Sequence, residues 1–336
     1  MRPGGRPFGS SKLFCVAPYR TGVTDPAVVV VADLIDPEAI RKLRAAGLEV
    51  VDASNGSSAL DAALPRAWAL VVRSRTKVTA ATLERAGKLR VVARAGVGVD
   101  NVDVPAATAR KVQVVNAPTA ATSSVAELTV ALILLLVRGL VPPIIGTHDG
   151  QWRRGSTGAE FEGRSVGFVG YGRIAREVAR RLQPFGGRRF AFDPFVRATD
   201  DGTELVSLER LLGESDIVSL HAALTPENHH LIDAARLRQM RPSAFLVNVA
   251  RGGLVDESAL RQALDEGTIA GAALDVFEEE PPRTPGLLQH PKVIATPHLG
   301  ASTPEAQRRA GDLVAEELLR IHRGENPKFL VNPDVG

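Results

Sequence analysis

Three segments of the sequence each carry one charged residue that can handle a proton or hold an anion. Arg251 lies in NVARGGLVDE, Glu280 in LDVFEEEP and His298 in TPHLGAST. An imidazole exchanges protons near neutral pH, a neighbouring carboxylate stabilises the imidazolium, and a guanidinium grips a carboxylate. Such groups suit the oxidation of an alcohol, in which a base takes the hydroxyl proton as a hydride leaves the carbon. Taken singly, each residue also fits a structural role.

A glycine-rich turn indicates a nucleotide that can take that hydride. Residues 165–175 read SVGFVGYGRIA, in which Gly170, Gly172 and Ala175 fill the small positions of the G-x-G-x-x-[G/A] pattern. Gly170 permits the tight turn, Gly172 lets the backbone approach a pyrophosphate, and Ala175 lets the following helix pack closely. That helix, which starts near Arg173, points its free N–H groups at the diphosphate. The pattern predicts a dinucleotide site.

The choice of dinucleotide depends on Asp193, which ends the next predicted strand in RRFAFDPF. A carboxylate about 20 residues after the turn accepts hydrogen bonds from the adenosine ribose and repels a 2′-phosphate. We therefore predict NAD as the cofactor, although Arg197 nearby leaves acceptance of NADP open. A structural turn followed by an ordinary strand-end Asp is the alternative interpretation. No metal ion is expected.

These residues need a scaffold in which strands and helices alternate, and two groups of short apolar runs predict the strands. The first group is residues 28–31, 69–72, 90–93 and 112–115, and the second is 166–169, 189–192, 217–220, 245–248 and 272–274. Predicted helices include residues 37–46, 122–137 and 303–322. Pro142 and Pro143 are expected to stop or kink the second helix before an irregular segment that reaches Phe161. The alternation predicts an α/β fold with two doubly wound, Rossmann-like parallel sheets.

The length of 336 residues suits two domains of about 150 residues each. Residues 27–117 with 300–332 are expected to form a discontinuous, flavodoxin-like substrate domain. Residues 118–299 are expected to form a Rossmann domain that binds NAD, with the active site in the cleft between the two. Residues 1–26 are rich in Gly, Pro, Ser and Arg, which indicates a flexible tail or a start codon assigned too early.

The composition is that of a globular protein with an ample core. Hydrophobic residues make up 44% of the chain, the mean hydropathy is +0.01, and 41 basic against 38 acidic residues give a net charge of +3. The longest apolar run, residues 128–137, is far shorter than the ~20 residues that cross a bilayer. No basic run suggests a nucleic acid, and no secretory signal is found. Cys15 is the only cysteine, so a reducing cytoplasm is expected.

Seven longer motifs resemble the D-isomer-specific 2-hydroxyacid dehydrogenases: VVRSRTKVT, RAGVGVDNVD, NAPT, GFVGYGRIAREVA, VNVARGGLVDE, GAALDVFEEEPP and TPHLGASTPEAQ. The resemblance covers about residues 28–331. It is strongest to the members that oxidise 3-phosphoglycerate to 3-phosphohydroxypyruvate with NAD, in serine biosynthesis. The chain stops soon after the long C-terminal helix, so the regulatory domains that many of these members carry are not expected.

The resemblance implies roles for individual residues. Arg251, Glu280 and His298 would be the catalytic trio. Glu278 and Glu279 compete with Glu280, but the family's glutamate directly precedes a proline, as Glu280 does here. Other residues would line the cofactor, with Asp275 on the nicotinamide carboxamide; the rest of that set is Val97, Arg173, Ile174, Ala222, Val249, Ala250, Gly300 and Ala301. Tyr171 departs from the family pattern, in which Leu is more frequent.

Arg73 and Arg75 in VVRSRT stand two residues apart at a predicted strand end, on one face if the chain is still extended there. Two guanidinium groups beside a crevice suit a phosphate, and in the phosphoglycerate enzymes this region meets the substrate phosphate. Val97 and Gly98 offer backbone N–H groups to the substrate carboxylate. Arg94 is a third candidate for the phosphate. Alternatively, Arg73 and Arg75 are solvated strand-end charges, and Arg94 belongs to a structural ion pair.

Two other functions stay open. A hydroxypyruvate or glyoxylate reductase shares the trio but need not bind a phosphate. Arg73 and Arg75 are therefore the feature that distinguishes such a reductase from an enzyme that acts on a phosphorylated acid. An NAD(H)-sensing binding protein, similar to the C-terminal-binding corepressors, also retains the trio. The expected partners are a small anionic 2-hydroxy or 2-oxo acid and a second copy of the chain in a homodimer or tetramer, with residues 122–137 and Trp152 near the contact. Neither nucleic acid nor membrane is expected.

Overall fold

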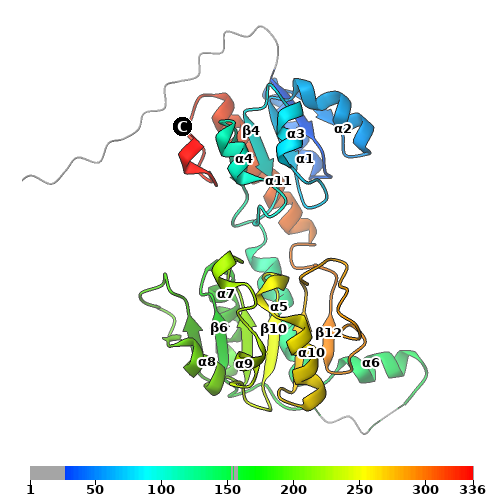
Figure 1. Ribbon diagram of the computed structural model, residues 1–336, viewed down its shortest axis with the longest axis vertical. Coiled ribbons are helices and arrows are strands. Elements are labelled where there is room, and N and C mark those ends of the chain that lie inside the picture. Colours follow the sequence, from blue (N-terminus) through cyan, green and yellow to red (C-terminus); the bar gives the residue numbers. More distant parts are fainter. Residues whose placement is uncertain (1–26, 153, 155–157, 336) are drawn as a thin grey trace, which may run out of the picture. The chain divides into compact units, whose positions relative to one another are not determined.

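The computed structural model describes residues 27–152, 154 and 158–335, and the chain divides into two compact units (Figure 1). Of the described residues, the discontinuous unit contains 27–118 and 310–335. The central unit runs from Thr119 to Arg309. The predicted tail, residues 1–26, lies outside the described residues.

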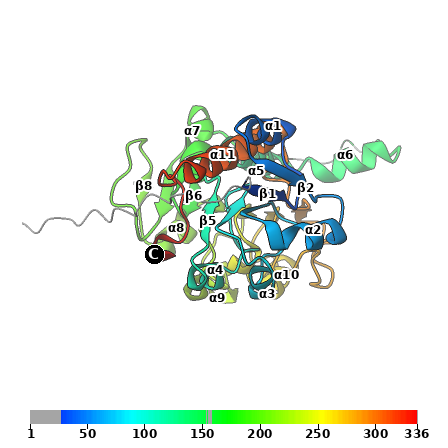
Figure 2. The ribbon, with the colours of Figure 1, turned by 90° about the horizontal axis from the view of Figure 1, so that it is seen from above.

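The discontinuous unit is built on a five-stranded parallel sheet in the order β2-β1-β3-β4-β5. Its strands are β1 (Val28–Val31), β2 (Glu49–Asp52), β3 (Ala69–Val72), β4 (Val91–Arg94) and β5 (Gln113–Asn116). One face carries α1 (Pro37–Ala45) and the C-terminal part of α11 (Pro304–His322), and the other carries α2 (Ser57–Ala63), α3 (Ala80–Arg85) and α4 (Val104–Ala109) (Figure 2). Because both faces are covered, every residue of β1 and β3 is buried, which explains their continuous apolar runs.

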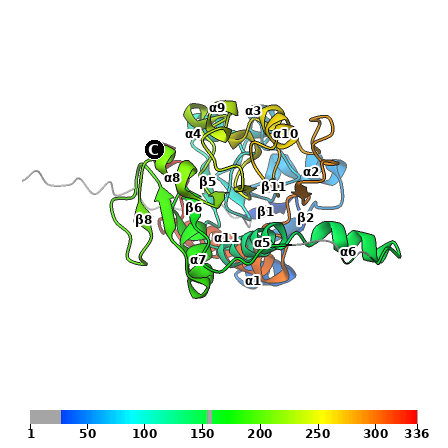
Figure 3. The same ribbon diagram turned by 90° about the horizontal axis from the view of Figure 1, so that it is seen from below.

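The central unit contains a seven-stranded parallel sheet in the order β12-β11-β10-β9-β6-β7-β8. Its strands are β6 (Val166–Val169), β7 (Arg189–Phe192), β8 (Glu204–Leu205), β9 (Ile217–Leu220), β10 (Phe245–Asn248), β11 (Gly271–Leu274) and β12 (Val293–Ala295). One face carries α5 (Thr122–Val137) and α7 (Arg173–Leu182), and the other carries α8 (Leu208–Glu214), α9 (Ala234–Leu237) and α10 (Glu257–Glu266) (Figure 3). The predicted α/β fold with two doubly wound parallel sheets is confirmed.

The apolar helix α5 spans the predicted residues. Leu132 and Ile133 are fully buried, and the helix packs against α7, β10 and β11. Among the described residues, no single helix is long and apolar enough to cross a membrane. Taken together, α5 and the next helix meet that length and composition, but they are bent 81° from each other.

That next helix, α6 (Val141–His148), differs from the prediction of an irregular segment after two helix-stopping prolines. Helix α5 does end at Val137, but the prolines lie in the first turn of α6. The N–H groups of a first turn have no intrahelical acceptor, so a proline loses nothing there. No residue of α6 is buried, and the helix projects from the rest of the central unit in all three views (Figures 1–3).

The short strands β2, β8 and β12 were not predicted. All three lie at or next to the edges of their sheets, and much of their surface is exposed, so their sequences lack the continuous apolar run of an internal strand. The second crossing between units also differs from the sequence-based boundary at residue 300, since it falls inside α11 after Arg309. The first turns of α11 stay with the central unit because Thr303 hydrogen-bonds Ser124 and Arg309 donates to the Ala120 carbonyl.

Candidate active site

The predicted site residues of the central unit all follow the carboxyl ends of its strands. The glycine turn follows β6, Asp193 follows β7, Ala222 follows β9, Arg251 follows β10, Asp275 and Glu280 follow β11, and His298 follows β12. The strands are parallel, so these segments share one edge of the sheet. The same edge holds the other predicted cofactor residues of this unit: Arg173, Ile174, Val249, Ala250, Gly300 and Ala301.

The glycine turn is shaped by one close backbone approach and one open space. Gly170 has φ +85°, and a Cβ there would lie 2.6 Å from the amide nitrogen of Ala222. A Cβ on Gly172 would meet nothing within 4 Å, so the surface above it is open to a ligand. Ala175 is fully buried, as its packing role requires. The turn, with the N-terminus of α7 behind it, has the form that accepts a diphosphate.

The Asp193 carboxylate lies beside this turn. Its Oδ2 accepts a hydrogen bond from the Tyr171 backbone amide at 2.8 Å, and its Oδ1 accepts one from the Phe195 amide at 2.9 Å. Each oxygen keeps a further lone pair for a hydroxyl group. These contacts hold the carboxylate beside the glycine turn, while its predicted contact with an adenosine ribose stays a prediction.

The unusual Tyr171 has a structural role in the same turn. The ring is fully buried, and its hydroxyl group hydrogen-bonds Asp201 and, at 2.7 Å, Thr203. Burial, reinforced by the hydrogen bond to Asp201, raises the pKa of Tyr171 above its ordinary value. The phenol therefore stays neutral and ties the glycine turn to the segment that leads into β8.

His298 and Glu280 are in direct contact. The imidazole Nδ1 lies 2.9 Å and 3.0 Å from the two carboxylate oxygens of Glu280, and both side chains are about half exposed. Glu280 also accepts from the Phe277 amide at 3.3 Å. A bond from Nδ1–H to a carboxylate leaves Nε2 as the basic atom of the neutral ring, so the arrangement fixes one tautomer.

The loop that carries His298 is held by Asp275, whose side chain is only 1% exposed. Its Oδ1 accepts from the Thr296 hydroxyl at 2.6 Å and the Leu299 amide at 2.7 Å, and its Oδ2 accepts from the Gly300 amide at 2.8 Å. The His298 amide donates to the Asp275 carbonyl at 2.9 Å, and His298 itself has φ +55°. These contacts give Asp275 a positioning role, while its predicted contact with a nicotinamide stays a prediction.

Arg251 stands in the loop after β10. Its guanidinium donates to the Ala250 carbonyl at 2.7 Å, and Asn248 donates to the Arg251 carbonyl at 2.9 Å. The next residue, Gly252, packs so closely that a Cβ would lie 1.8 Å from the Phe277 carbonyl carbon. The Arg251 loop and the loop that leads to Glu280 are therefore in backbone contact.

His221, at the end of β9, was not among the predicted site residues. Its Nε2 lies 2.9 Å from the Ser219 hydroxyl oxygen, and burial lowers its pKa to about 3. The ring is consequently neutral at physiological pH. Only its place after a fully buried strand distinguishes it in the sequence.

The two predicted phosphate ligands of the discontinuous unit differ from each other. Strand β3 ends at Val72 and the chain bends, so the extended backbone assumed for Arg73 and Arg75 is not present. Arg75 donates to Asp33 at 3.3 Å, to the Ala32 carbonyl at 3.0 Å and to the Ser54 carbonyl at 2.5 Å. Its guanidinium is thus engaged in holding strand ends together. Within the described residues, the Arg73 guanidinium makes no hydrogen bond or ion pair.

Asp33 organises this corner, and sequence analysis missed it. Burial would raise its pKa, but hydrogen bonds from the Thr76 hydroxyl and from the amides of Arg73 and Thr76, with the charge of Arg75, outweigh burial and lower the pKa. A carboxylate directly after the buried run VVVVA was the available signal. The buried anion fixes the backbone of Arg73.

The loop after β4 contains the predicted residues Val97 and Gly98. Asn116 donates to the Val97 carbonyl at 2.6 Å, and the Ala117 amide donates to the Gly96 carbonyl at 2.9 Å. The Arg94 guanidinium lies over Gly96, where a Cβ would be 1.6 Å from its Nη1. Gly96 leaves room for this packing, which favours a structural role for Arg94.

Comparison with known proteins identifies the family. Residues 130–300 match the model of the NAD binding domain of the D-isomer specific 2-hydroxyacid dehydrogenases. The chain is 44% identical over 309 residues to D-3-phosphoglycerate dehydrogenase of Methanocaldococcus jannaschii, an alignment that covers 90% of this chain and 59% of that protein. The chain therefore spans less than two thirds of the length of this curated relative.

Solved structures agree. The TT0316 protein from Thermus thermophilus matches with a TM-score of 0.83 and 35% identity, over 90% of this chain and 99% of that one. A glyoxylate reductase from Paecilomyes thermophila matches with a TM-score of 0.83 and 27% identity, over 93% and 99%. With the glycine turn and the His298–Glu280 pair on one edge of an NAD-binding sheet, this chain belongs to the D-isomer specific 2-hydroxyacid dehydrogenase family.

Proposed function

We propose that this protein is an NAD-dependent dehydrogenase that oxidises 3-phosphoglycerate to 3-phosphohydroxypyruvate, a step of serine biosynthesis. The observation that carries the proposal is the contact between His298 and Glu280 on the sheet edge that also holds the glycine turn. Similarity at 44% identity to a protein named D-3-phosphoglycerate dehydrogenase supports the choice of substrate.

The residues present fit the cofactor. The open surface over Gly172 and the N-terminus of α7 suit the diphosphate, and Asp193 suits the ribose hydroxyls. Bound NAD supplies the acceptor for the hydride. The carboxylate of Asp193 would repel a 2′-phosphate, so NAD is favoured over NADP, and none of the described contacts of Asp193 involves Arg197.

The proton of the substrate hydroxyl goes to His298. With Nδ1 bonded to Glu280, the Nε2 atom is the base, and it takes the proton as the C2–H bond breaks and the C2–O bond becomes a carbonyl. The Glu280 carboxylate stabilises the imidazolium that forms, as in other His–carboxylate pairs. Asp275 keeps the ring in place by holding the loop on both sides of it.

Substrate orientation is assigned to two arginines. Arg251, whose loop contacts the loop that leads to Glu280, grips the substrate carboxylate and polarises the C2 oxygen. Arg73 is the first choice for the phosphate, because Nε and Nη2 of Arg75 donate to Asp33 and two backbone carbonyls, although the Arg75 side chain is 63% exposed. Val97 and Gly98 contribute backbone amides to the anionic substrate in this proposal.

A second candidate function is a glyoxylate or hydroxypyruvate reductase. It is favoured by the hydrogen bonds of Arg75 to Asp33 and Ser54, which leave fewer Arg75 N–H groups for a phosphate than the sequence predicts. The structural similarity to a glyoxylate reductase is consistent with it. The two functions share the His298–Glu280 pair and differ in whether Arg73 meets a phosphate.

We also propose that the protein is a homodimer in the cytoplasm. Helix α6 has only eight residues and none of them is buried, although a helix of this length has little stability alone in water. Ile144, Ile145 and Trp152 are 57%, 55% and 75% exposed, which is typical of an interface. A second copy of the chain is the economical partner. A reducing compartment fits the single cysteine.

A substrate panel tests the choice of acid. We expect a higher kcat/KM for 3-phosphoglycerate than for glycerate, and Arg73→Ala should raise the KM for 3-phosphoglycerate about 10- to 100-fold, the worth of a charged hydrogen bond. The KM for glycerate should not change, because glycerate lacks the phosphate. A wild-type preference for glyoxylate or hydroxypyruvate would support the second candidate instead.

Steady-state kinetics of His298→Ala test the proton acceptor. We expect kcat to fall by about two to four orders of magnitude, because the general base is lost. Glu280→Gln should cause a smaller loss and change the pH profile of kcat/KM. Glu279→Gln is the matched control, since Glu279 pairs with Arg283 and not with His298. Turnover near the wild-type level in His298→Ala would remove this residue from the mechanism.

Cofactor choice is tested with Asp193→Ala. We expect kcat/KM for NAD to fall about 10- to 100-fold, because two hydroxyl hydrogen bonds to a charged group are lost, while kcat/KM for NADP rises. Asp200→Ala is the control, since Asp200 is nearby, almost fully exposed and paired only weakly with Arg176. Equal efficiency of the wild-type enzyme with the two cofactors would contradict the role given to Asp193.

Analytical ultracentrifugation tests the dimer. We expect a dimer at micromolar concentration, and the double variant Ile144→Glu/Ile145→Glu should shift it to monomer because it places charges in the apolar contact. Leu288→Glu is the control, an exposed apolar position outside α6. A wild-type monomer, or a double variant that still dimerises fully, would rule out α6 as the contact.

A further inference from the structure

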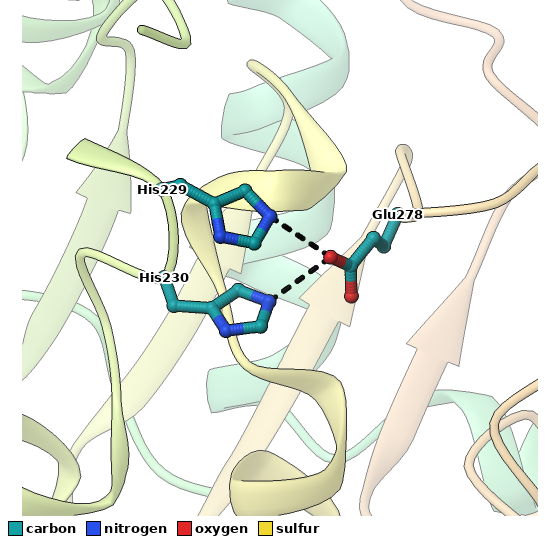
Figure 4. A group of neighbouring side chains, drawn as sticks. All are labelled: His229, His230 and Glu278. Atoms are coloured by element: carbon teal, nitrogen blue, oxygen red, sulfur yellow. Dashed lines mark hydrogen bonds and ion pairs between the residues drawn. The ribbon is translucent and has the colours of Figure 1, made fainter. Parts of the chain in front are cut away.

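Three metal-ligating side chains meet outside the residues described above (Figure 4). His229 and His230 belong to the connection between β9 and β10, and Glu278 belongs to the loop after β11. The Nε2 atoms of both imidazoles lie 3.0 Å from the same oxygen, Oε1 of Glu278. We call these residues the His-His-Glu cluster. No metal site is expected from the sequence, in which Glu278 lies 48 residues from the nearer histidine.

The backbone explains how two consecutive side chains reach one point. In an extended segment, neighbouring side chains point to opposite sides. His229 has extended angles, φ −59° and ψ 132°, but His230 is in the left-handed region with φ +52°. The rings therefore stack, with centroids 3.9 Å apart and planes inclined by 28°. A left-handed backbone is uncommon for a residue other than glycine and persists only where the surroundings hold it.

The surroundings do hold it. The His230 amide donates to the Gly253 carbonyl at 2.7 Å, and the Ile232 amide donates to the Leu254 carbonyl at 2.8 Å. The segment before the histidines is closed by Asn228, which accepts from the Thr225 amide at 2.7 Å and donates to the Ala223 carbonyl at 2.7 Å. The backbone that carries the two imidazoles is thus held against the turn that follows Arg251.

The Glu278 backbone is also held by hydrogen bonding and close packing. Its amide donates to Oε1 of the buried Glu257 at 2.7 Å, and the other oxygen of Glu257 accepts from the Thr284 hydroxyl at 2.5 Å. Gly252 packs against the peptide between Phe277 and Glu278, where a Cβ would lie 2.3 Å from the Glu278 nitrogen. Both sides of the cluster are therefore fastened to the same turn, Gly252–Leu254.

We propose that the His-His-Glu cluster binds one divalent transition-metal ion of the zinc class. Two imidazole nitrogens and one carboxylate oxygen are a donor set that Zn²⁺ prefers, and three protein ligands leave the fourth position for water. Metal–ligand bonds of about 2.0–2.1 Å in a tetrahedron put the ligand atoms about 3.3 Å apart. The two Nε2–Oε1 distances of 3.0 Å therefore need to lengthen by only a few tenths of an ångström. The cluster is partly exposed, so an ion reaches it from solvent.

The ion would link the connection before β10 to the loop after β11, two residues from Glu280. It does not use the Glu280 carboxylate, which contacts His298. The proposal is therefore independent of the catalytic role given to that pair, and binding can be measured without turnover. Since the ion binds only the folded chain, it stabilises that state in proportion to its occupancy.

Calorimetric titration of the metal-free full chain with Zn²⁺ alone tests the site, in a Cys15→Ser background that removes the only thiol. We expect one ion per chain, a rise in Tm with Zn²⁺, and d–d absorption of a tetrahedral ion when Co²⁺ replaces it. His230→Gln and Glu278→Gln should each weaken binding at least about tenfold and abolish the rise in Tm. Glu279→Gln, the neighbour outside the cluster, should bind as tightly as the parent chain.

The controls separate this site from the catalytic pair. His298→Gln should leave the titration unchanged, so loss of binding in that variant with retention in His230→Gln would overturn the proposal. Absence of binding by the parent chain, or equal binding by His230→Gln and Glu278→Gln, would also overturn it. If a variant fails to fold, X-ray absorption of the zinc-loaded parent chain decides: two imidazoles and oxygen ligands support the cluster, and any other donor set contradicts it.

Discussion

The buried carboxylate of Asp275 is the interaction on which the candidate active site depends most directly. It accepts hydrogen bonds from Thr296, Leu299 and Gly300, and its own backbone carbonyl accepts from His298. A Cβ on Gly300 would come within 3.2 Å of this carboxylate, so the loop closes tightly around it. The position of His298 is therefore set by a buried side chain that lies outside the proposed proton transfer.

Neighbouring loops along the sheet edge also hold each other in place where their backbones approach closely. Gly170 lets the glycine turn contact the segment at Ala222, and Gly252 lets the Arg251 loop contact the segment at Phe277. At each place a side chain would force two loops apart. Because neighbouring loops support each other through backbone contact, the half-exposed side chains they carry can be held without being buried.

The turn Gly252–Leu254 contacts both the segment of Arg251 and the His-His-Glu cluster. Arg251 directly precedes it, and both the segment of His230 and the loop of Glu278 contact it. Anchoring by Glu257 fixes the loop that carries first Glu278 and then Glu280. An ion at the cluster would therefore stiffen the loop that positions the partner of His298, which connects the two sites through covalent chain rather than through shared ligands.

Sequence alone determined the elements whose signals are local. The apolar runs of internal parallel strands, such as Val28–Val31 and Ile217–Leu220, show burial on both faces, and the glycine spacing after Val169 shows the turn. The edge strands and helix α6 were not predicted, because exposed segments lack a periodic apolar pattern.

Only the tertiary structure decided which charged groups meet. In the folded chain Arg75 hydrogen-bonds Asp33, Asp275 accepts hydrogen bonds from the His298 loop, and His230 lies against Glu278. These contacts join residues that lie 24 to 48 positions apart, and their geometry depends on strand order and on single backbone angles such as the φ of His230. The residue types along the chain show which chemical groups are available. Which of these groups form hydrogen bonds with each other depends on the folded backbone, because a hydrogen bond forms only over about 3 Å.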